Sequence, residues 1–290
     1  MLTTVKKKLK KPEYTDKKDI AVINENFDKL DDLVTDGFVI VAAVNSFNKE
    51  KADFICDAVG DQEQLRLAIN RIKLNGTAGG TILLMPGDYF FNKDGVTEVD
   101  GVFNLVELED NISIIGFNAN IKLDTNTIQA GKKCNMFYAN AKTGMRIEGI
   151  RIDCNGNTNA NNVTGIRLLS CNDILVTNVT VMNAVTNGYG LYLSGNDAKV
   201  FKNLLVNCTF GIYLASGTNS MIHMNKVRNC VNGIYNLSTY ADIQMNMTRN
   251  CTTQSIYSSG NYSRVANNDC YGKSPTVSGT GSITTSSNRS

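Results

Sequence analysis

The 290-residue sequence has no tryptophan, only three prolines and a single histidine, His223, so it offers few of the groups that usually perform catalysis or bind metals. No acidic residue or cysteine lies beside His223 in the sequence, and we expect it to be a surface residue without a chemical role. The eight cysteines form no clusters and no C-x-x-C pairs. The sequence therefore predicts neither a metal site nor a cofactor.

Long apolar segments are also missing. The longest apolar run, FVIVAAV at 38–44, is far too short to cross a bilayer. The basic start of the chain, MLTTVKKKLKKPEY, is not followed by the apolar region that a signal peptide requires. We therefore expect no membrane insertion and no export through the general secretory route.

Charge is divided unevenly along the chain. Residues 1–110 carry 14 basic and 20 acidic residues, whereas residues 111–290 carry 15 basic and 7 acidic residues. A basic C-terminal part would suit an acidic polymer such as a charged glycan, although most lysines of this kind are simply solvated. We expect no nucleic-acid partner.

The C-terminal half repeats itself with a period of about 22 residues. Four tyrosines, each preceded by an aliphatic residue, are separated by 21, 22 and 22 residues: Tyr192, Tyr213, Tyr235 and Tyr257. The segment GIRL at 165–168 resembles an earlier copy of the same unit. Two further rows keep nearly the same period. They are the cysteines Cys208, Cys230, Cys251 and Cys270 and the asparagines Asn178, Asn203, Asn225, Asn246 and Asn267.

Each repeat contains short stretches in which apolar and polar residues alternate, such as MIHMNKV and DILVTNVTV, separated by glycine, asparagine and serine. Alternation with a period of two predicts strands. Several strands in about 22 residues match one coil of a right-handed parallel β-helix, whose coils stack about 4.8 Å apart. Stacking places like residues above one another, so we expect the asparagine row to form a hydrogen-bonded ladder. We expect the cysteine row to consist of small buried apolar residues.

The segment at 52–91, ADFICDAVGDQEQLRLAINRIKLNGTAGGTILLMPGDYFF, resembles the N-terminal part of pectate-lyase-like β-helices. Its helical pattern places four apolar residues on one face: Leu65, Ala68, Ile69 and Ile72. The resemblance implies a helix that caps the N-terminal end of the coil stack. We accordingly divide the chain into an attachment segment at 1–36, a linker strand and capping helix at 37–79, and a β-helix of seven to eight coils at 80–290.

The first 36 residues, which include KLKKPEYTDKKDIAVINENFDKLDDLV, resemble the N-terminal segment of tail proteins from bacteriophages and prophages. Five apolar residues in this segment are separated by 3, 4, 3 and 4 positions: Ile20, Ile23, Phe27, Leu30 and Val34. This spacing describes a short coiled-coil seam, and isoleucine at such positions favours three strands. A single amphipathic helix on the following domain is the alternative. The resemblance implies a homotrimer held on a tail or baseplate protein through residues 1–36.

Candidate catalytic groups are sparse, because only seven acidic residues follow Asp110. The segments SCND and SGND place Asp173 and Asp197 on one turn in adjacent coils, and we expect Asp242 in the same row. Asp153, in RIDCNGN, resembles a stretch of many β-helix glycosidases, but the second aspartate pair and the Gly-His of those enzymes are missing. Ordinary turn chemistry is the alternative for the Asn-Asp pairs.

If the aliphatic residue of each repeat points inward, alternation turns the four tyrosines outward. An exposed tyrosine stripe can stack on sugar rings, and it can equally form a contact between protomers. The sequence therefore predicts a structural phage tail appendage of the tailspike type, in the virion, that recognises a host cell-wall or capsular polysaccharide and is not an enzyme. A polysaccharide depolymerase (a glycoside hydrolase or lyase) and a structural tail component without a ligand are the two alternatives.

Overall fold

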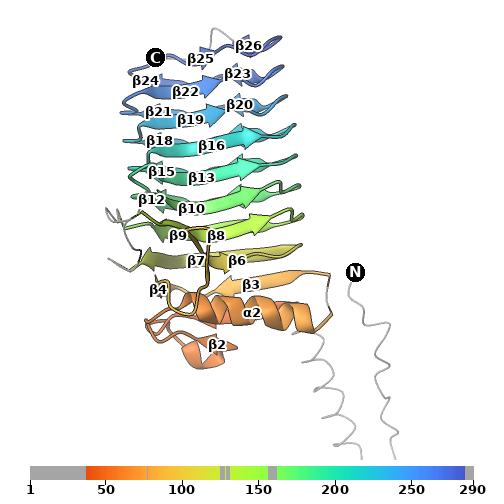
Figure 1. Cartoon of the computed structure of the whole chain (residues 1–290), viewed down its shortest axis with the longest axis vertical. Coiled ribbons are helices and arrows are strands. Elements are labelled where there is room, and N and C mark those ends of the chain that lie inside the picture. The colour runs from red at the N-terminus through yellow and green to blue at the C-terminus, as the bar shows by residue number, and fades with distance from the viewer. Residues whose placement is uncertain (1–36, 77, 125–127, 129–130, 156–161, 285–290) are drawn as a thin grey trace, which may run out of the picture.

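A computed structural model describes residues 37–76, 78–124, 128, 131–155 and 162–284. These residues form a right-handed parallel β-helix, as the sequence predicts, with one α-helix across its N-terminal end (Figure 1). The expected coiled-coil seam of Ile20, Ile23, Phe27, Leu30 and Val34 lies outside the described residues. No helix among the described residues is both long and apolar enough to span a bilayer.

The N-terminal part of the described chain contains the cap and the first strands. Its elements are β1 (Phe38–Ala42), the 3-10 helix η2 (Lys49–Lys51), β2 (Phe54–Ile55), α2 (Gln62–Leu74), β3 (Gly80–Leu84) and β4 (Gly87–Phe91). The predicted face of α2 is buried, since Leu65, Ala68, Ile69 and Ile72 are each at most 3% exposed. The helix α2 therefore covers the end of the core. Burial of its large apolar side chains stabilises the fold by roughly 1.5–3 kcal/mol for each residue.

Sheet B is one wall of the helix. Its strands are β5 (Glu98–Val99), β6 (Val102–Glu107), β8 (Lys133–Asn140), β10 (Asn162–Leu169), β13 (Tyr189–Ser194), β16 (Phe210–Ser216), β19 (Asn232–Asn236), β22 (Gln254–Ser258) and β25 (Thr276–Val277). All neighbours in this sheet pair in parallel except β5 and β6, which form an antiparallel pair. Successive strands of sheet B therefore belong to successive coils.

Sheet A forms the remaining walls. After β1 to β4 it contains β7 (Ile112–Leu123) and β9 (Arg146–Asp153). From there each long strand is replaced by two short ones: β11 (Leu175–Thr177), β12 (Thr180–Met182), β14 (Lys199–Phe201), β15 (Leu204–Val206), β17 (Met221–His223), β18 (Lys226–Arg228), β20 (Asp242–Gln244), β21 (Met247–Arg249), β23 (Arg264–Ala266), β24 (Asp269–Tyr271) and the last strand, β26 (Ile283–Thr284).

The corner between the two short strands of each coil explains why asparagine is so frequent. The first corner residue has a left-handed backbone, with φ between 54° and 58° at Asn178, Lys202, Met224, Met245 and Asn267. The second corner residue is buried, and three members of the predicted ladder occupy it: Asn203, Asn225 and Asn246. Each of these accepts the backbone N–H of the preceding coil on its side-chain oxygen at 2.9–3.0 Å.

The prediction of the ladder was wrong for two of its five members. Asn178 and Asn267 occupy the first, left-handed position of the corner, one residue before the ladder. The ladder continues instead through Asn268, whose Oδ1 accepts from the backbone N–H and the Nδ2 of Asn246 at 3.0 Å. The prediction failed at these ends because Val179 occupies the ladder position in the earliest coil and because another asparagine, Asn267, stands directly before Asn268.

The interior is a continuous column of aliphatic side chains with cysteines among them. All eight cysteines are buried and free, which agrees with their predicted role as small apolar residues. Cys208, Cys230, Cys251 and Cys270 are at most 5% exposed.

Candidate functional site: an aromatic ladder on sheet B

The outer face of sheet B carries a column of aromatic residues. The strand register pairs Tyr192 with Tyr213, Tyr213 with Tyr235 and Tyr235 with Tyr257. Their ring centroids are 5.1, 5.3 and 4.5 Å apart, and the planes of adjacent rings differ by only 15–29°. We call these four residues the tyrosine ladder. The four residues therefore form one continuous row, and their rings stack on one another.

Alternation along each strand sets the direction of these rings. In β16, Ile212 and Leu214 are at most 1% exposed, whereas Tyr213 between them is half-buried. The residual burial of each tyrosine comes from its neighbours in the column, which cover the faces of the ring. Burial raises the pKa of Tyr213, and the adjacent phenols of Tyr192 and Tyr189 raise it further.

A second, shorter aromatic row lies beside the ladder. Tyr189 stacks on Phe210 with centroids 5.0 Å apart and planes 16° apart. Tyr189 meets Tyr192 edge to face at 5.1 Å, and Phe210 meets Tyr213 in the same way at 5.3 Å. Edge-to-face and offset contacts of this kind stabilise by about 0.5–1.5 kcal/mol each beyond the area they bury. The aromatic surface is thus two columns wide and internally braced.

The sequence analysis missed this second row and also the residue that precedes the ladder. Arg167 occupies the ladder position of β10, opposite Tyr192, and its guanidinium carbon lies 4.5 Å from the Tyr192 ring centroid. The signal was present, because the segment GIRL aligns with GIYL and places arginine where later repeats have tyrosine. Tyr138 and Glu107 continue the same column towards the N-terminal end.

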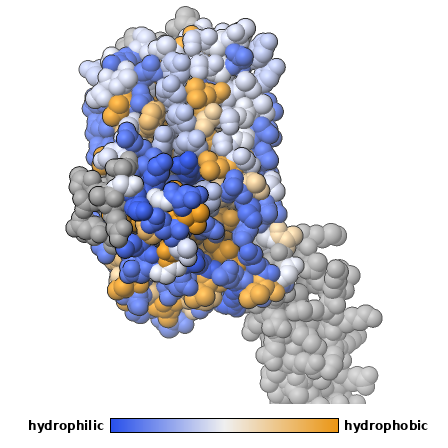
Figure 2. All heavy atoms as spheres, viewed as in Figure 1, coloured by the Kyte–Doolittle hydropathy of each residue, from blue (hydrophilic) through white to orange (hydrophobic). Residues whose placement is uncertain are grey.

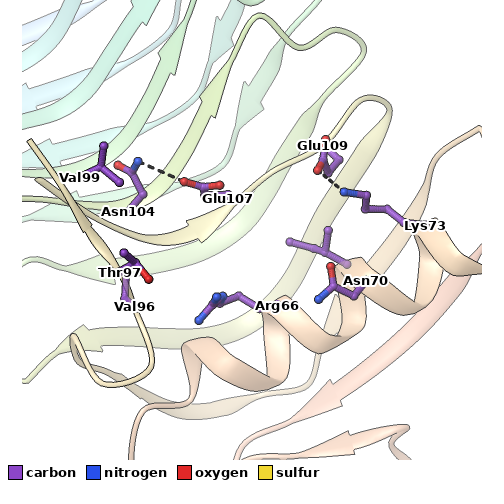
Figure 3. A pocket seen from close by; sticks show the side chains of 10 residues that line it. Arg66, Asn70, Lys73, Val96, Thr97, Val99, Asn104, Glu107 and Glu109 are labelled. Atoms are coloured by element: carbon purple, nitrogen blue, oxygen red, sulfur yellow. Dashed lines mark hydrogen bonds and ion pairs between the residues drawn. The ribbon is translucent and has the colours of Figure 1, made fainter.

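A polar pocket of about 440 Å³ lies at that end of sheet B, between α2 and the β5–β6 hairpin (Figure 3). Arg66, Asn70 and Lys73 of α2 line it on one side, and Asn104 and Glu107 of β6 on the other. Asn104 donates to Glu107 at 3.2 Å, and Arg66 pairs with Glu63 at 2.9 Å. The pocket is therefore hydrophilic, and Glu107 belongs both to the pocket and to the column that leads to the ladder.

Glu109 closes the rim of this pocket. Its carboxylate accepts hydrogen bonds from Lys73 of α2 and from Lys142. Burial opposes ionisation of the carboxyl, but the two lysines outweigh burial and hold the pKa of Glu109 below its usual value. Glu109 is therefore an ionised link between the cap and the coil stack.

The predicted catalytic candidates lie on other faces of the molecule. Asp173 and Asp197 occupy equivalent left-handed turn positions in adjacent coils, with φ of 49° and 57°, and both are exposed. Asp173 lies 3.4 Å from Lys199 Nζ. Asp242 is not in this row, contrary to the prediction, because the strand register places it beside Met221, two residues later in the coil. Turn geometry accounts for the pair.

Asp153 lies on the outer face of sheet A beside a pocket of about 180 Å³, which Asn120, Lys122 and Arg151 also line. The Asp153 side chain accepts from Asn183 Nδ2 and from the backbone N–H of Asn155, both at 2.8 Å. Asp153 thus faces a pocket together with a lysine and an arginine, where a bound sugar would reach its carboxylate.

His223 is not the isolated surface residue that the sequence predicts. Its Nε2 lies 3.0 Å from Oδ2 of Asp242 in the next coil, and its side chain is only 16% exposed. Gln244 also donates to Asp242, at 2.6 and 2.7 Å. The prediction was wrong because the acid is adjacent through the strand register and not along the sequence.

Comparison with solved structures finds chains of low similarity. One, described as a candidate glycosyl hydrolase from Parabacteroides merdae, is 13% identical with a TM-score of 0.41, over 80% of this chain and 88% of that one. The A-module of the mannuronan C-5 epimerase AlgE4 from Azotobacter vinelandii is 15% identical with a TM-score of 0.36, over 73% of each chain. These likenesses carry no argument about function.

No curated protein matches the chain. A family model does: the one described as periplasmic copper-binding protein (NosD) matches residues 104–288. That match includes the tyrosine ladder, the asparagine ladder and all coils from β6 onward. Because it spans well over half of the 290 residues, this chain belongs to the NosD family.

Proposed function

We propose that this chain is a non-enzymatic tail appendage of a bacteriophage or prophage that binds a polysaccharide of the host surface along the tyrosine ladder. The observation that carries glycan binding is the ladder itself, four stacked phenols on a rigid sheet. Tyrosine offers an apolar ring face together with a hydroxyl, a combination that suits sugars, which have apolar ring faces and many hydroxyl groups. Attachment to the tail is supported by the sequence of residues 1–36.

The geometry suits a linear polymer. Three coil steps separate Tyr192 from Tyr257, which corresponds to about 14 Å along the axis of the stack. Figure 2 shows one side of the stack, on which much of the upper half is pale with some orange residues and a blue, hydrophilic band crosses the middle. A chain laid along the axis from Tyr257 would meet the tyrosine ladder first, and then the part of the column that contains Arg167 and Glu107.

Copper binding, which the family description mentions, does not fit the residues of this chain. Among the described residues no three His, Cys, Asp or Glu side chains come together in a way that could hold a metal ion. The cysteines are buried in the core, and Asp242 already engages His223. The proposal therefore does not use copper.

The proposal is tested by measuring binding of the full chain to purified polysaccharide from candidate hosts. Tyr213→Ala removes the centre of the ladder and should weaken binding about tenfold or more, as for a residue at the centre of a contact surface. Tyr271→Ala is the matched control, because Tyr271 is an exposed tyrosine of β24 in the other sheet. Equal affinities of the two variants and the unmodified chain would overturn the proposal.

The ladder can alternatively serve as a contact between protomers of a homotrimer. Analytical ultracentrifugation of the same variants separates the two roles. The ladder is an interface between protomers if two results are found together. Tyr213→Ala dissociates the oligomer, and monomers of the unmodified chain do not bind glycan. If the variant keeps its oligomeric state and loses the glycan, the proposal stands. Mass spectrometry of purified virions tests the tail assignment directly.

The pocket beside Asp153 favours a second candidate function, a polysaccharide depolymerase. Incubation with the bound polysaccharide would then release new reducing ends for a hydrolase, or unsaturated sugars for a lyase. Asp153→Asn should abolish this release, whereas Asp197→Asn on the exposed turn serves as the control. We expect no products from the unmodified chain.

A further inference from the structure

Arg167 is the one member of the outer column between Tyr138 and Tyr257 that is not a tyrosine. The guanidinium group lies over the face of Tyr192, and this stacking fixes its position at the end of the ladder. The group also lowers the pKa of Tyr138 and of Tyr189, in opposition to the larger effect of burial, so its charge is felt by phenols on both sides. Arg167 is thus a half-buried cation that stacks on the Tyr192 ring and lies close enough to Tyr138 and Tyr189 to affect their phenols.

No carboxylate among the described residues neutralises the charge of Arg167. Among the described residues, no carboxylate oxygen lies within 4.0 Å of its guanidinium, and it donates no hydrogen bond. Two cations of the preceding coil are engaged: Arg146 pairs with Glu148, and Lys142 pairs with Glu109. A partly buried guanidinium with free donors is ready to receive an anion in a bidentate contact.

Arg167 lies at the N-terminal end of the tyrosine ladder, in the same column of side chains. It lies one coil before Tyr192, so a polymer on the ladder would place its next unit over the guanidinium. Glu107 lies two coils further along the same column, about 10 Å from Arg167, and would repel a second anion there. The column therefore has one place for a negative group, and Arg167 marks it.

From these observations we infer that the polymer bound by the ladder is an anionic glycan, one of whose carboxylate or phosphate groups is held by Arg167. The inference rests on the proposed glycan binding and narrows it to a chemical class. The excess of 15 basic over 7 acidic residues in 111–290 favours the approach of such a polymer.

The test uses the full chain and an array of immobilised polymers. Polygalacturonate carries carboxylates, glycerol-phosphate teichoic acid carries phosphates, and carboxyl-reduced polygalacturonate and dextran are neutral. We expect binding to at least one acidic polymer, about tenfold or more stronger than to the neutral ones, and weakened by added salt. Which acidic polymer binds distinguishes carboxylate from phosphate recognition.

Arg167→Gln should remove this preference and weaken acidic binding about tenfold, because a charge-assisted contact is lost. Arg228→Gln, an exposed arginine on β18 of sheet A, changes the net charge equally and should have little effect. Equal losses in the two variants would reduce the effect to bulk charge and overturn the inference. Binding of a neutral polymer alone would also overturn it while leaving glycan binding intact. Failure to bind these polymers together with failure to bind the polysaccharides of candidate hosts would overturn the proposed function itself.

Discussion

Asn225 donates from its side-chain nitrogen to Oδ1 of Asn246 at 3.0 Å, and the same oxygen accepts the backbone N–H of Asn225, also at 3.0 Å. Its side-chain nitrogen also donates to the carbonyl of Val200 at 2.9 Å. The Asn225 amide thus bonds to two backbone groups of the preceding coil, Asn203 N–H and Val200 C=O, and to the Asn246 side chain of the following coil. Repetition of this arrangement holds the corner of sheet A in register, because an unsatisfied buried amide is costly.

Replacing Asn225 by alanine should lower the free energy of unfolding by about 3 kcal/mol. It removes the acceptor of the Asn203 backbone N–H, one of the two acceptors of the Asn203 side-chain nitrogen, and the side-chain donor to the Val200 carbonyl. Urea unfolding followed by circular dichroism measures the change. Asn229→Gly is the control: it removes an exposed bond from Asn250 and keeps the left-handed backbone, so we expect a loss below about 1 kcal/mol. Similar losses in both variants would contradict the structural role of the ladder.

The link between Glu109 and its two lysines should make stability depend on pH. Because the pKa of Glu109 is lower in the folded state, its contribution is present above the usual carboxyl pKa and disappears as the pH falls through the folded value. Glu109→Gln should therefore destabilise the chain by about 1 kcal/mol at pH 7 and by much less at pH 3. Unfolding of both proteins at the two pH values checks this. A difference that is constant with pH would rule out the ionic origin.

Glu63→Gln serves as the control for the same experiment. It removes an exposed pair with Arg66 within α2, three residues apart, and should cost only a few tenths of a kcal/mol at pH 7.

Gly217 should not tolerate any side chain. A Cβ at this residue would lie 1.7 Å from the carbonyl oxygen of Gly195 in the preceding coil, and its φ of +114° is one that other residues rarely adopt. Gly217→Ala should therefore destabilise the fold by roughly 3 kcal/mol or prevent folding. Gly272→Ala is the control. Gly272 has a φ of +92°, but no atom lies within 4 Å of a Cβ placed there, so only the backbone conformation opposes the substitution and the chain should still fold. Comparison of soluble yield and thermal midpoint decides between them.

The cysteines should resist thiol reagents in the folded chain. Burial raises the pKa of Cys251 to about 12, and a contact with Cys208 together with burial raises the pKa of Cys230 still further. Because the thiolate is the reactive form, Ellman's reagent at pH 8 should react slowly with the native chain and rapidly with all eight cysteines after denaturation. Fast native labelling of several cysteines would show that the core is open.

The rows that the sequence revealed most clearly were those with one residue type at one position. Tyr192, Tyr213, Tyr235 and Tyr257 lie in register, because each is fixed by the buried aliphatic residue before it. The capping face of α2 was predicted correctly for the same reason, since its apolar spacing matches the helical period. Apolar side chains that recur at a fixed spacing and point into the core are a strong sequence signal. Both the tyrosine ladder and the buried face of α2 have such side chains.

Predictions failed where the row changed residue type or the coil changed length. Asn268 was overlooked because Asn267 stands next to it, and the corner of the earliest coil carries Val179 in the ladder position. Asp242 was assigned to the turn row although it lies in the strand that follows. Tyr189 and Phe210 share a row that elsewhere contains threonine, asparagine and glutamine, so no single residue type marks it in the sequence. Contacts across coils, such as that between His223 and Asp242, become visible only once the register is known.

The spacing of the four tyrosine rings follows from the hydrogen-bonded strands beneath them, which keep the rings 4.5–5.3 Å apart. The spacing of the rings is therefore fixed before a partner binds. Most of the conformational entropy lost on association is then lost by the partner. Stiff polymers with a regular repeat lose the least freedom in this way. Flexible or branched molecules of the same chemistry should be poorer partners, so the rigidity of the scaffold is itself a means of selection.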